Sequence, residues 1–136
     1  MTSCSDEELM AAAREIRARA HAPYSQYQVG AALIDDQGRL HLGCNVENAA
    51  YPEGTCAETN AIGAMVAGGG TRIRVIAVAG GPAKAEPQAC TPCGGCRQRI
   101  REFADANTRI LLVDADGGIA VHRMDALLPL SFQLKD

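Results

Sequence analysis

The spacing of apolar positions in the first third of the chain predicts a helix followed by a β-hairpin. Ser5 and Glu8 have the spacing of a capping box, and apolar residues follow them at helical intervals, which predicts a helix near residues 6–20. The short apolar run 29–34 and the stretch 39–44 flank turn-forming residues, as the two strands of a hairpin do.

Helix and strand patterns alternate in the rest of the chain. Residues 55–66 have the pattern of a second helix, and the glycines at 68–70 are expected to end it rather than to bind a phosphate. Residues 73–79 and 109–113 are almost wholly apolar, as strands covered on both faces are. A third helix is expected between them, over about 92–103, with a proline in its first turn.

This order of elements predicts an α/β fold. A strand, a helix and a strand in succession favour a right-handed parallel crossover. Together with the hairpin, it predicts a three-layer α/β/α sandwich with a mixed sheet of about five strands. With 136 residues, 47% of them hydrophobic and 21% charged, the chain has the size and composition of one globular domain, expected to span residues 1–136.

Charge and hydropathy narrow the classes of partner. The chain has 13 Lys and Arg against 16 Asp and Glu, a net charge of −3, which argues against a nucleic acid polymer as partner. No stretch approaches the roughly 18 apolar residues of a membrane helix, and the polar first residues do not resemble a secretory signal. We therefore expect a cytoplasmic protein whose six cysteines are thiols or metal ligands before they are disulfides.

Cys93 and Cys96 carry the clearest chemical signal. Residues three apart share a helix face, so both sulfurs can reach one metal ion. With Thr91 as the N-cap and Pro92 as the first helical residue, both thiols are expected in or near the first turn. The positive end of a helix favours the thiolate form, which is the form that binds metals.

This pair alone leaves other functions open. A Cys-x-x-Cys motif is also typical of a redox centre or of half of a structural zinc site. Cys90 precedes Cys93 by three residues, as in an iron–sulfur run, but Ile100 stands where that run has its fourth cysteine.

A further cysteine and a glutamate lie at the predicted start of the second helix. Thr55 and Glu58 have the spacing of a capping box, so helix capping is one interpretation of Glu58. Cys56 lies between them, again at a positive helix end.

The other interpretation is catalytic. If the starts of the two helices face each other, Cys56, Cys93 and Cys96 form a three-sulfur zinc site, and a fourth position left for water is typical of catalytic zinc. Glu58, two residues from a ligand, is then placed to contact that water and to shuttle protons.

These motifs resemble the signature of zinc-dependent deaminases. In that signature a His or Cys ligand, with Glu two residues later, precedes Pro-Cys-x-x-Cys. The chain has the all-cysteine form and resembles the small, homotetrameric cytidine deaminases. The resemblance covers most of the chain and depends on five separated segments in family order, at residues 24–33, 43–51, 56–58, 92–96 and 127–132.

The resemblance implies roles in metal binding and catalysis. It implies one Zn²⁺ per chain, held by Cys56, Cys93 and Cys96, with Glu58 as the catalytic proton shuttle. From its place next to Cys96, Arg97 is expected to be able to donate a hydrogen bond to a ligand sulfur.

The resemblance also implies how a nucleoside is held. The residue matching Tyr27 packs on the base, and the backbone N–H of Ala57 orients it. Asn45 and Glu47 match the residues that bind the ribose hydroxyls, and an amide and a carboxylate on alternate strand positions suit a diol. Without the family, the same pair is explained by polar caps at a strand end.

Two further aromatic residues imply that the site is completed by a neighbouring subunit. Tyr51 matches a loop near a neighbour's site, and Phe132 matches a residue that reaches a neighbour's pocket from the C-terminal segment. The chain has only five Phe and Tyr residues, and three of them stand at these site positions. A homotetramer with sites at its subunit interfaces is therefore expected.

One residue departs from the family pattern. Many members with three cysteine ligands have Arg directly after the catalytic Glu, and this chain has Thr59. Zinc with three thiolates carries a formal charge of about −1, which weakens it as a Lewis acid. Thr59 therefore puts the tuning of the metal in doubt rather than the class of reaction.

The implied reaction is the hydrolytic deamination of cytidine and deoxycytidine to uridine and deoxyuridine, with release of ammonia, as in pyrimidine salvage. Two alternatives stay open. One is a deaminase of the same fold that acts on a modified cytidine or a nucleoside antibiotic, and the other is a non-catalytic zinc or redox module. The acidic balance and the ribose-binding pair argue against editing of RNA or DNA.

Overall fold

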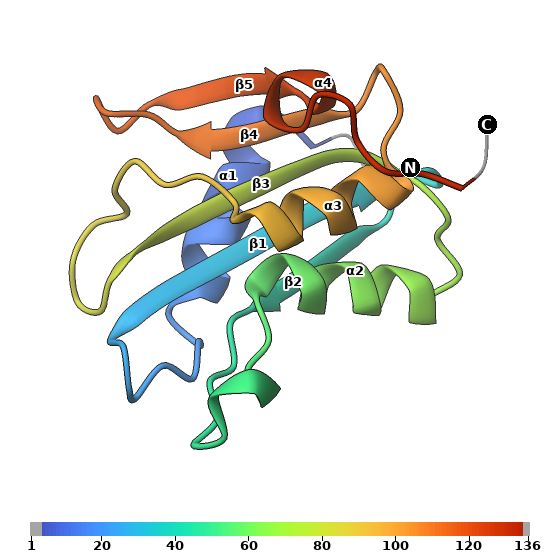
Figure 1. The fold of residues 1–136 in the computed structure, drawn as a ribbon. Coiled ribbons are helices and arrows are strands. Elements are labelled where there is room, and N and C mark those ends of the chain that lie inside the picture. Colours follow the sequence, from blue (N-terminus) through green and yellow to red (C-terminus); the bar gives the residue numbers. More distant parts are fainter. Residues whose placement is uncertain (1–3, 135–136) are drawn as a thin grey trace.

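A computed structural model of the chain contains a mixed sheet of five strands between two layers of helices (Figure 1). It describes residues 4–134, so the two ends of the predicted domain lie outside the described residues. The strands are β1 (Tyr27–Asp35), β2 (Leu40–Cys44), β3 (Ile73–Pro82), β4 (Arg109–Val113) and β5 (Ile119–Arg123). They lie in the order β2-β1-β3-β4-β5, with β3 and β4 parallel and the other neighbours antiparallel. The predicted hairpin and the parallel crossover are thereby confirmed.

The helices cover both faces of the sheet. They are α1 (Asp6–Arg17), α2 (Ala57–Ala67), α3 (Gly94–Phe103) and α4 (Met124–Leu127), with a short 3₁₀ turn, η1 (Tyr51–Glu53). Figure 1 shows α1 behind the sheet and α2 and α3 side by side in front of it, which confirms the three-layer sandwich. Within residues 4–134, no helix has both the length and the apolar character needed to cross a membrane.

Each face of the sheet has its own hydrophobic core. On the α1 face, Leu9 and Met10 pack among residues of β1, β3 and β4. On the other face, Met65 of α2 and Ile100 of α3 share a cluster with Leu33 of β1. Because neighbouring residues of a strand point to opposite faces, β3 has a core on both sides and is apolar along most of its length. Each large aliphatic side chain buried in this way contributes about 1.5–3 kcal/mol.

The third helix begins two residues later than the sequence predicts. Thr91 is not the N-cap and Pro92 is not helical, because α3 begins at Gly94 and Cys93 is its N-cap. The Cys93 carbonyl oxygen accepts the first helical hydrogen bond from the Arg97 N–H, at 2.9 Å. The Arg97 guanidinium donates to the Pro92 carbonyl oxygen at 2.8 Å and so holds Pro92 before the helix.

The second helix also begins two residues late, at Ala57, with Cys56 as its N-cap. The predicted capping box of Thr55 and Glu58 is therefore wrong, whereas the box of Ser5 and Glu8 at α1 is confirmed. The Thr55 hydroxyl instead accepts a hydrogen bond from the side chain of Asn60 at 3.1 Å. Glu58 is thus left without a capping role.

Helix α2 lies directly on β2 at Gly43. A Cβ atom at Gly43 would lie 2.5 Å from the carbonyl oxygen of Ala57 and 2.4 Å from the backbone nitrogen of Ala61. Both atoms belong to the α2 backbone, so a side chain at this position would push the helix away from the sheet. Gly43 therefore sets how closely the first turn of α2 approaches the sheet.

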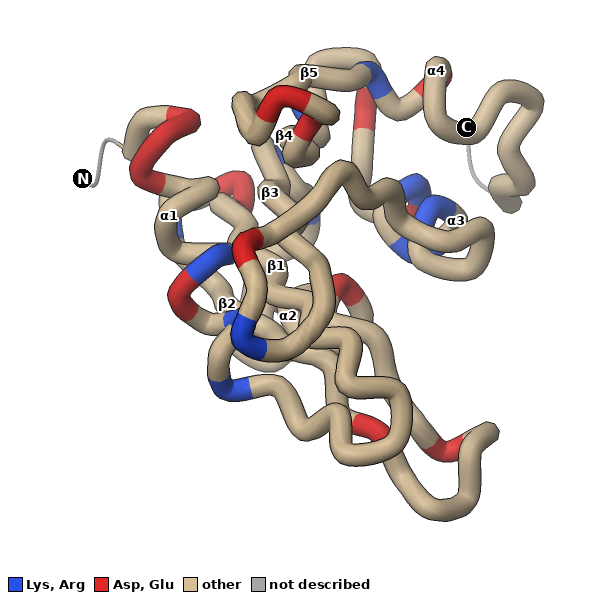
Figure 2. The backbone as a smooth tube through the Cα atoms, turned by 90° about the vertical axis from the view of Figure 1, so that its left-hand side faces the viewer, with Lys and Arg blue, Asp and Glu red and all other residues tan. Residues whose placement is uncertain are grey.

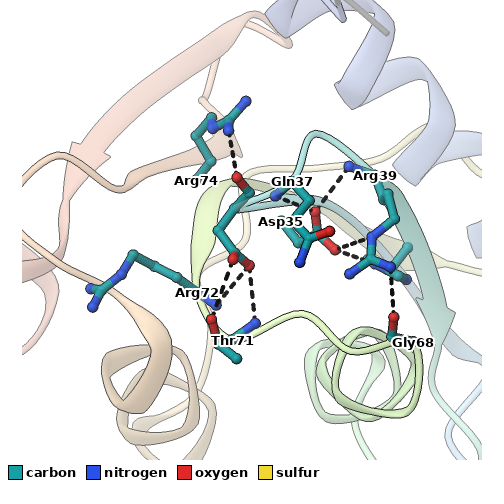
Figure 3. A network of polar contacts seen from close by, with 9 residues as sticks. Asp35, Gln37, Arg39, Gly68, Thr71, Arg72 and Arg74 are labelled. Atoms are coloured by element: carbon teal, nitrogen blue, oxygen red, sulfur yellow. Dashed lines mark hydrogen bonds and ion pairs between the residues drawn. The ribbon is translucent and has the colours of Figure 1, made fainter. Parts of the chain in front are cut away.

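The hairpin turn is tied to the end of α2 through a buried carboxylate (Figure 3). Asp35 accepts hydrogen bonds from the backbone N–H groups of Gln37 and Arg39, from Nε of Arg39 at 3.0 Å and from the His41 ring at 2.9 Å. Nη1 of Arg39 donates to the Gly68 carbonyl oxygen at 2.7 Å. Burial opposes ionisation of Asp35, but these hydrogen bonds outweigh it and hold the pKa of Asp35 well below its usual range.

Candidate active site

The starts of α2 and α3 bring three cysteines together. Cys56 is the N-cap of α2, Cys93 is the N-cap of α3, and Cys96 lies in the first turn of α3. Their sulfur atoms all lie within 4.8 Å of one another. The two helices begin on the same side of the sheet, as Figure 1 shows, so the predicted convergence of residues 56, 93 and 96 is present.

This donor set fits a zinc ion. A tetrahedral ion about 2.3 Å from each sulfur keeps its sulfur ligands about 3.8 Å apart. With the sulfurs within 4.8 Å of one another, closing on such an ion needs a contraction of about 1 Å at most. Cys90 is not part of this group.

The three thiols have different surroundings. The backbone N–H groups of Cys96 and Gly95 point at the Cys93 sulfur and lower the pKa of Cys93 despite partial burial. Burial raises the pKa of Cys56 and of Cys96, and the charge of Glu58 adds to the rise at both. Cys93 is therefore the thiol that ionises most readily of the three, and a bound cation would favour the ionised form of all of them.

Glu58 lies beside the sulfurs as a buried carboxyl group. Only 4% of Glu58 is exposed, and none of the ion pairs found among the described residues involves it. Burial raises the pKa of Glu58, although its own backbone N–H, the Cys96 thiol and the charge of Arg99 act in the opposite direction. A carboxyl group whose pKa is raised by burial is better suited to general acid–base catalysis than an exposed one.

These groups line a cleft of about 360 Å³. The three cysteines and Glu58 line it, together with Tyr27, Asn45, Glu47, Tyr51 and Ala57. All of the predicted site residues except Phe132 therefore share this cleft. Its size is within the range of pockets that bind small molecules.

The predicted ribose-binding pair faces the cleft but also has partners in the protein. Oδ1 of Asn45 accepts from the Val29 N–H at 2.8 Å, and its Nδ2 donates to the Tyr27 carbonyl oxygen at 3.0 Å. Glu47 accepts from the N–H groups of Tyr24 and Ser25 and from the Ser25 hydroxyl. An amide and a carboxylate have more donor and acceptor positions than these bonds use, so both side chains keep capacity for a diol.

Tyr27 forms a side wall of the cleft near the loop that precedes α3. Its hydroxyl accepts a hydrogen bond from Nε2 of Gln88 at 3.4 Å. Burial and the adjacent Cys90 thiol raise the pKa of Tyr27, so the ring stays neutral and offers an uncharged aromatic face. The sequence did not point to Gln88 or to Cys90 as neighbours of this ring.

The other two aromatic residues lie at or beyond the rim. Tyr51 is 74% exposed and meets the ring of Tyr24 edge-on, with ring centroids 5.8 Å apart. Phe132 is 67% exposed and does not line the cleft of its own chain. Its carbonyl oxygen accepts from Nε2 of Gln98 in α3, at 3.0 Å. A role of Phe132 in a neighbour's site stays a prediction.

The arginine beside the sulfurs is not the predicted one. Arg97 donates to the carbonyl oxygens of Pro92 and Leu127, both at 2.8 Å, rather than to a ligand sulfur. Instead, Nη1 of Arg99 lies 3.9 Å from the Cys96 sulfur. Helical spacing was the missed signal, because residues three apart share a face and adjacent residues do not.

Comparison with known proteins shows similarity along most of the chain. The model of the family described as "Cytidine and deoxycytidylate deaminase zinc-binding region" matches residues 3–112. A cytidine deaminase of Sporosarcina psychrophila is 36% identical over 133 residues, which are 96% of this chain and 93% of that protein. A cytidine deaminase of Mycobacterium tuberculosis is 37% identical over 124 residues, covering 91% of this chain and 86% of that protein.

Solved structures agree with the sequence comparison. The crystal structure of cytidine deaminase from Burkholderia pseudomallei matches with a TM-score of 0.84 at 36% identity, covering 94% of this chain and 99% of that one. The corresponding structure from Mycobacterium tuberculosis matches with a TM-score of 0.82 at 34% identity, covering 97% of this chain and 100% of that one.

Proposed function

Because this chain belongs to the cytidine and deoxycytidylate deaminase family, we propose that it catalyses the hydrolytic deamination of cytidine and deoxycytidine. The products are uridine or deoxyuridine and ammonia. One observation carries the proposal: the buried carboxyl group of Glu58 and three convergent sulfurs line the same cleft, which has a volume of about 360 Å³. This arrangement supports catalysis over a closed structural zinc site, in which a fourth side chain fills the last position.

Cys56, Cys93 and Cys96 are the residues that would hold one Zn²⁺ ion per chain. When bound, the ion would supply Lewis-acid chemistry, which lowers the pKa of a water molecule. The two helix starts direct backbone N–H groups toward the thiolates and offset part of their charge.

Glu58 moves the protons of the reaction. Its carboxylate takes a proton from the attacking water and delivers it to N3 of the cytosine ring. As the water oxygen bonds to C4, Glu58 carries the second proton of that oxygen to the amino group, and the bond between C4 and this amino group breaks to release ammonia. Burial supports this role, because it raises the pKa of Glu58 toward the pH at which the enzyme works.

The rest of the cleft positions the nucleoside. Tyr27 packs on the base and the backbone N–H of Ala57, which lies in the first turn of α2 and has no acceptor within the helix, orients it. Asn45 and Glu47 bind the ribose hydroxyls with the donor and acceptor positions that their protein partners leave free.

Replacing Glu58 by Gln tests the proposal. Glutamine has nearly the same shape as glutamate, but its amide cannot act as an acid or a base at neutral pH. Turnover of cytidine should therefore fall by about 10²–10⁴-fold while one zinc per chain is retained. Ammonia release and metal content are measured on the same sample. Substantial turnover by the variant would refute the shuttle, and an absence of zinc from the unaltered protein would refute the metal site itself.

The quaternary state and cellular setting belong to the same proposal. We infer that one domain spans residues 1–136, that four copies assemble, and that Tyr51 and Phe132 complete sites at the subunit interfaces. The high exposure of both rings in the single chain supports this arrangement. The corresponding cellular setting is the cytoplasm, where the enzyme would take part in pyrimidine salvage. Light scattering on the eluting protein measures the number of copies directly.

A further inference from the structure

The cleft accumulates negative charge when it binds a metal. Three thiolates around one dication leave a net negative charge, and the carboxyl group of Glu58 lies beside them. No Lys or Arg is among the described residues that line the cleft. The charge therefore needs a compensating cation from outside the lining.

Arg99 is the cation in contact with the cluster. Its Nη1 atom lies 3.9 Å from the sulfur of Cys96, which is three residues earlier in α3 and on the same helix face. The guanidinium passes over Gly95, where a Cβ atom would lie 3.1 Å from Nη1. The lack of a side chain at Gly95 thus leaves room for Arg99 to fold back toward the sulfurs.

The neighbouring arginines of α3 are engaged elsewhere. Figure 2 shows that α3 carries several basic positions. Arg97 donates to the Leu127 carbonyl oxygen at 2.8 Å, and Arg101 donates to the Ser131 hydroxyl at 2.9 Å. Both guanidinium groups are directed toward the C-terminal segment, so Arg99 alone of these three is bonded to a sulfur.

The position of Arg99 is unfavourable without an anion. A helix N-terminus carries positive partial charge, so an arginine that folds back over the first turn is repelled by it. Nearby on α2, Thr59 follows Glu58 and offers no charge, and its hydroxyl oxygen is buried without a hydrogen-bond partner. Anionic sulfurs are the groups that make this place favourable for the Arg99 guanidinium.

We propose that Arg99 is a positioning residue that neutralises the thiolate cluster and thereby strengthens zinc binding. The inference depends on the proposed zinc site. Thr59 of α2 carries no positive charge, so the compensating charge is assigned to Arg99 of α3. Its action is electrostatic and passes through the sulfur of Cys96, so Arg99 itself does not contact the substrate.

Zinc affinity measured by competition with a chromophoric chelator tests this inference. Arg99→Gln removes the charge from an exposed side chain and should weaken zinc binding by about 10–100-fold. Arg99→Lys keeps the charge and should restore most of the affinity. Arg101→Ala, which removes a charge from the same helix away from the sulfurs, should leave the affinity within about twofold of the unaltered protein.

Salt gives a readout that a purely structural role would not move. The gap between the Gln variant and the unaltered protein should narrow as the salt concentration rises to about 1 M, because salt screens exposed charges. Equal affinity in the Gln variant, a loss in the Lys variant as large as in the Gln variant, or an equal loss in the Arg101 variant would overturn the proposal. Failure of the unaltered protein to bind zinc would instead overturn the metal site.

Discussion

At the scale of single residues, chemistry in this cleft depends on where each cysteine stands relative to a helix start. Cys90 and Cys93 are three residues apart and both line the cleft. Only Cys93 is the N-cap of a helix, where backbone N–H groups lower its thiol pKa. Cys90 lies instead beside Tyr27, outside the sulfur cluster. Two cysteines of one short segment therefore have different surroundings.

Serine substitutions separate these two cysteines. Cys93→Ser removes a thiolate ligand, so the variant should lose zinc and, with it, nearly all cytidine turnover. Cys90→Ser keeps the three ligands and should retain one zinc per chain. Metal content per chain is measured for both proteins. Loss of zinc from the Cys90 variant would mean that the third sulfur has been misassigned.

At the scale of elements, the site depends on how α2 and α3 rest on the sheet. Gly43 of β2 lets the backbone of α2 approach the sheet closely at Ala57, directly between Cys56 and Glu58. Gly43, which does not line the cleft, thus fixes the positions of Cys56 and Glu58. The precision of the cleft is a property of strand–helix packing as much as of the cleft residues.

A pair of glycine-to-alanine variants tests this dependence. Gly43→Ala inserts a Cβ atom 2.4 Å from the backbone of Ala61, so it should destabilise the fold by about 1–3 kcal/mol and weaken zinc binding. Gly63→Ala, within α2 itself, meets no atom within 4 Å and should be neutral or stabilise the helix by about 0.5–1 kcal/mol. Thermal unfolding and zinc titration of both variants give the comparison. Equal behaviour would show that contact at Gly43 does not position α2.

The sequence predicted the elements better than their ends. Long apolar runs identified the buried strands at 73–79 and 109–113, because a core on both faces leaves no polar position. β5 at Ile119–Arg123 was not located, since its residues are only half buried or exposed and its pattern is weak. Both helix starts were placed two residues early, because the caps are cysteines rather than the usual capping residues.

The candidate site was predicted from motif spacing, but its supporting contacts were not. The convergence of residues 56, 93 and 96 followed from two short motifs. The choice between Arg97 and Arg99 needed the helix register and the bond between Arg97 and Leu127, which joins segments 30 residues apart. Contacts of that kind arise from tertiary packing and leave no local pattern.

At the scale of the whole molecule, hydrogen bonds of two aspartates stabilise the end of the sheet that lies opposite the cleft. Asp35 closes the hairpin turn, and Arg39 connects that turn to the end of α2 at Gly68. Asp36 accepts hydrogen bonds from the N–H groups of Thr71 and Arg72, which lead into β3 (Figure 3). Stability at this end is therefore partly ionic, and it depends on pH.

Asp35→Asn should make the protein less stable at neutral pH by about 1.5–3 kcal/mol, because the buried hydrogen-bond donors lose an anionic acceptor. The folded-state pKa of Asp35 is lowered, so its contribution is complete above the unfolded pKa of about 3.9 and is lost as the pH falls toward the folded value. The gap in stability between the variant and the unaltered protein should close as the pH falls below about 4.

Urea unfolding at several pH values measures that gap. Asp125→Asn is the matched control, because Asp125 pairs with Arg123 where both side chains are 67% exposed and screened by water. Arg123 also lowers the pKa of Asp125, but because the pair is exposed, this variant should shift the unfolding midpoint far less than Asp35→Asn at every pH. A constant gap for Asp35→Asn across the pH range would contradict the ionic explanation.

The close approach of the three sulfurs also bears on how the metal-free protein ages. Thiols within 4.8 Å of one another need only modest side-chain rotation to meet. An oxidant that accepts two electrons can then join two of them as a disulfide, with release of two protons, and the ligand set is lost until a reductant cleaves the bond. A bound cation protects the sulfurs from this oxidation. Stripping zinc with a chelator in air should thus inactivate the chain lastingly, whereas stripping it under a thiol reductant should leave it open to reconstitution.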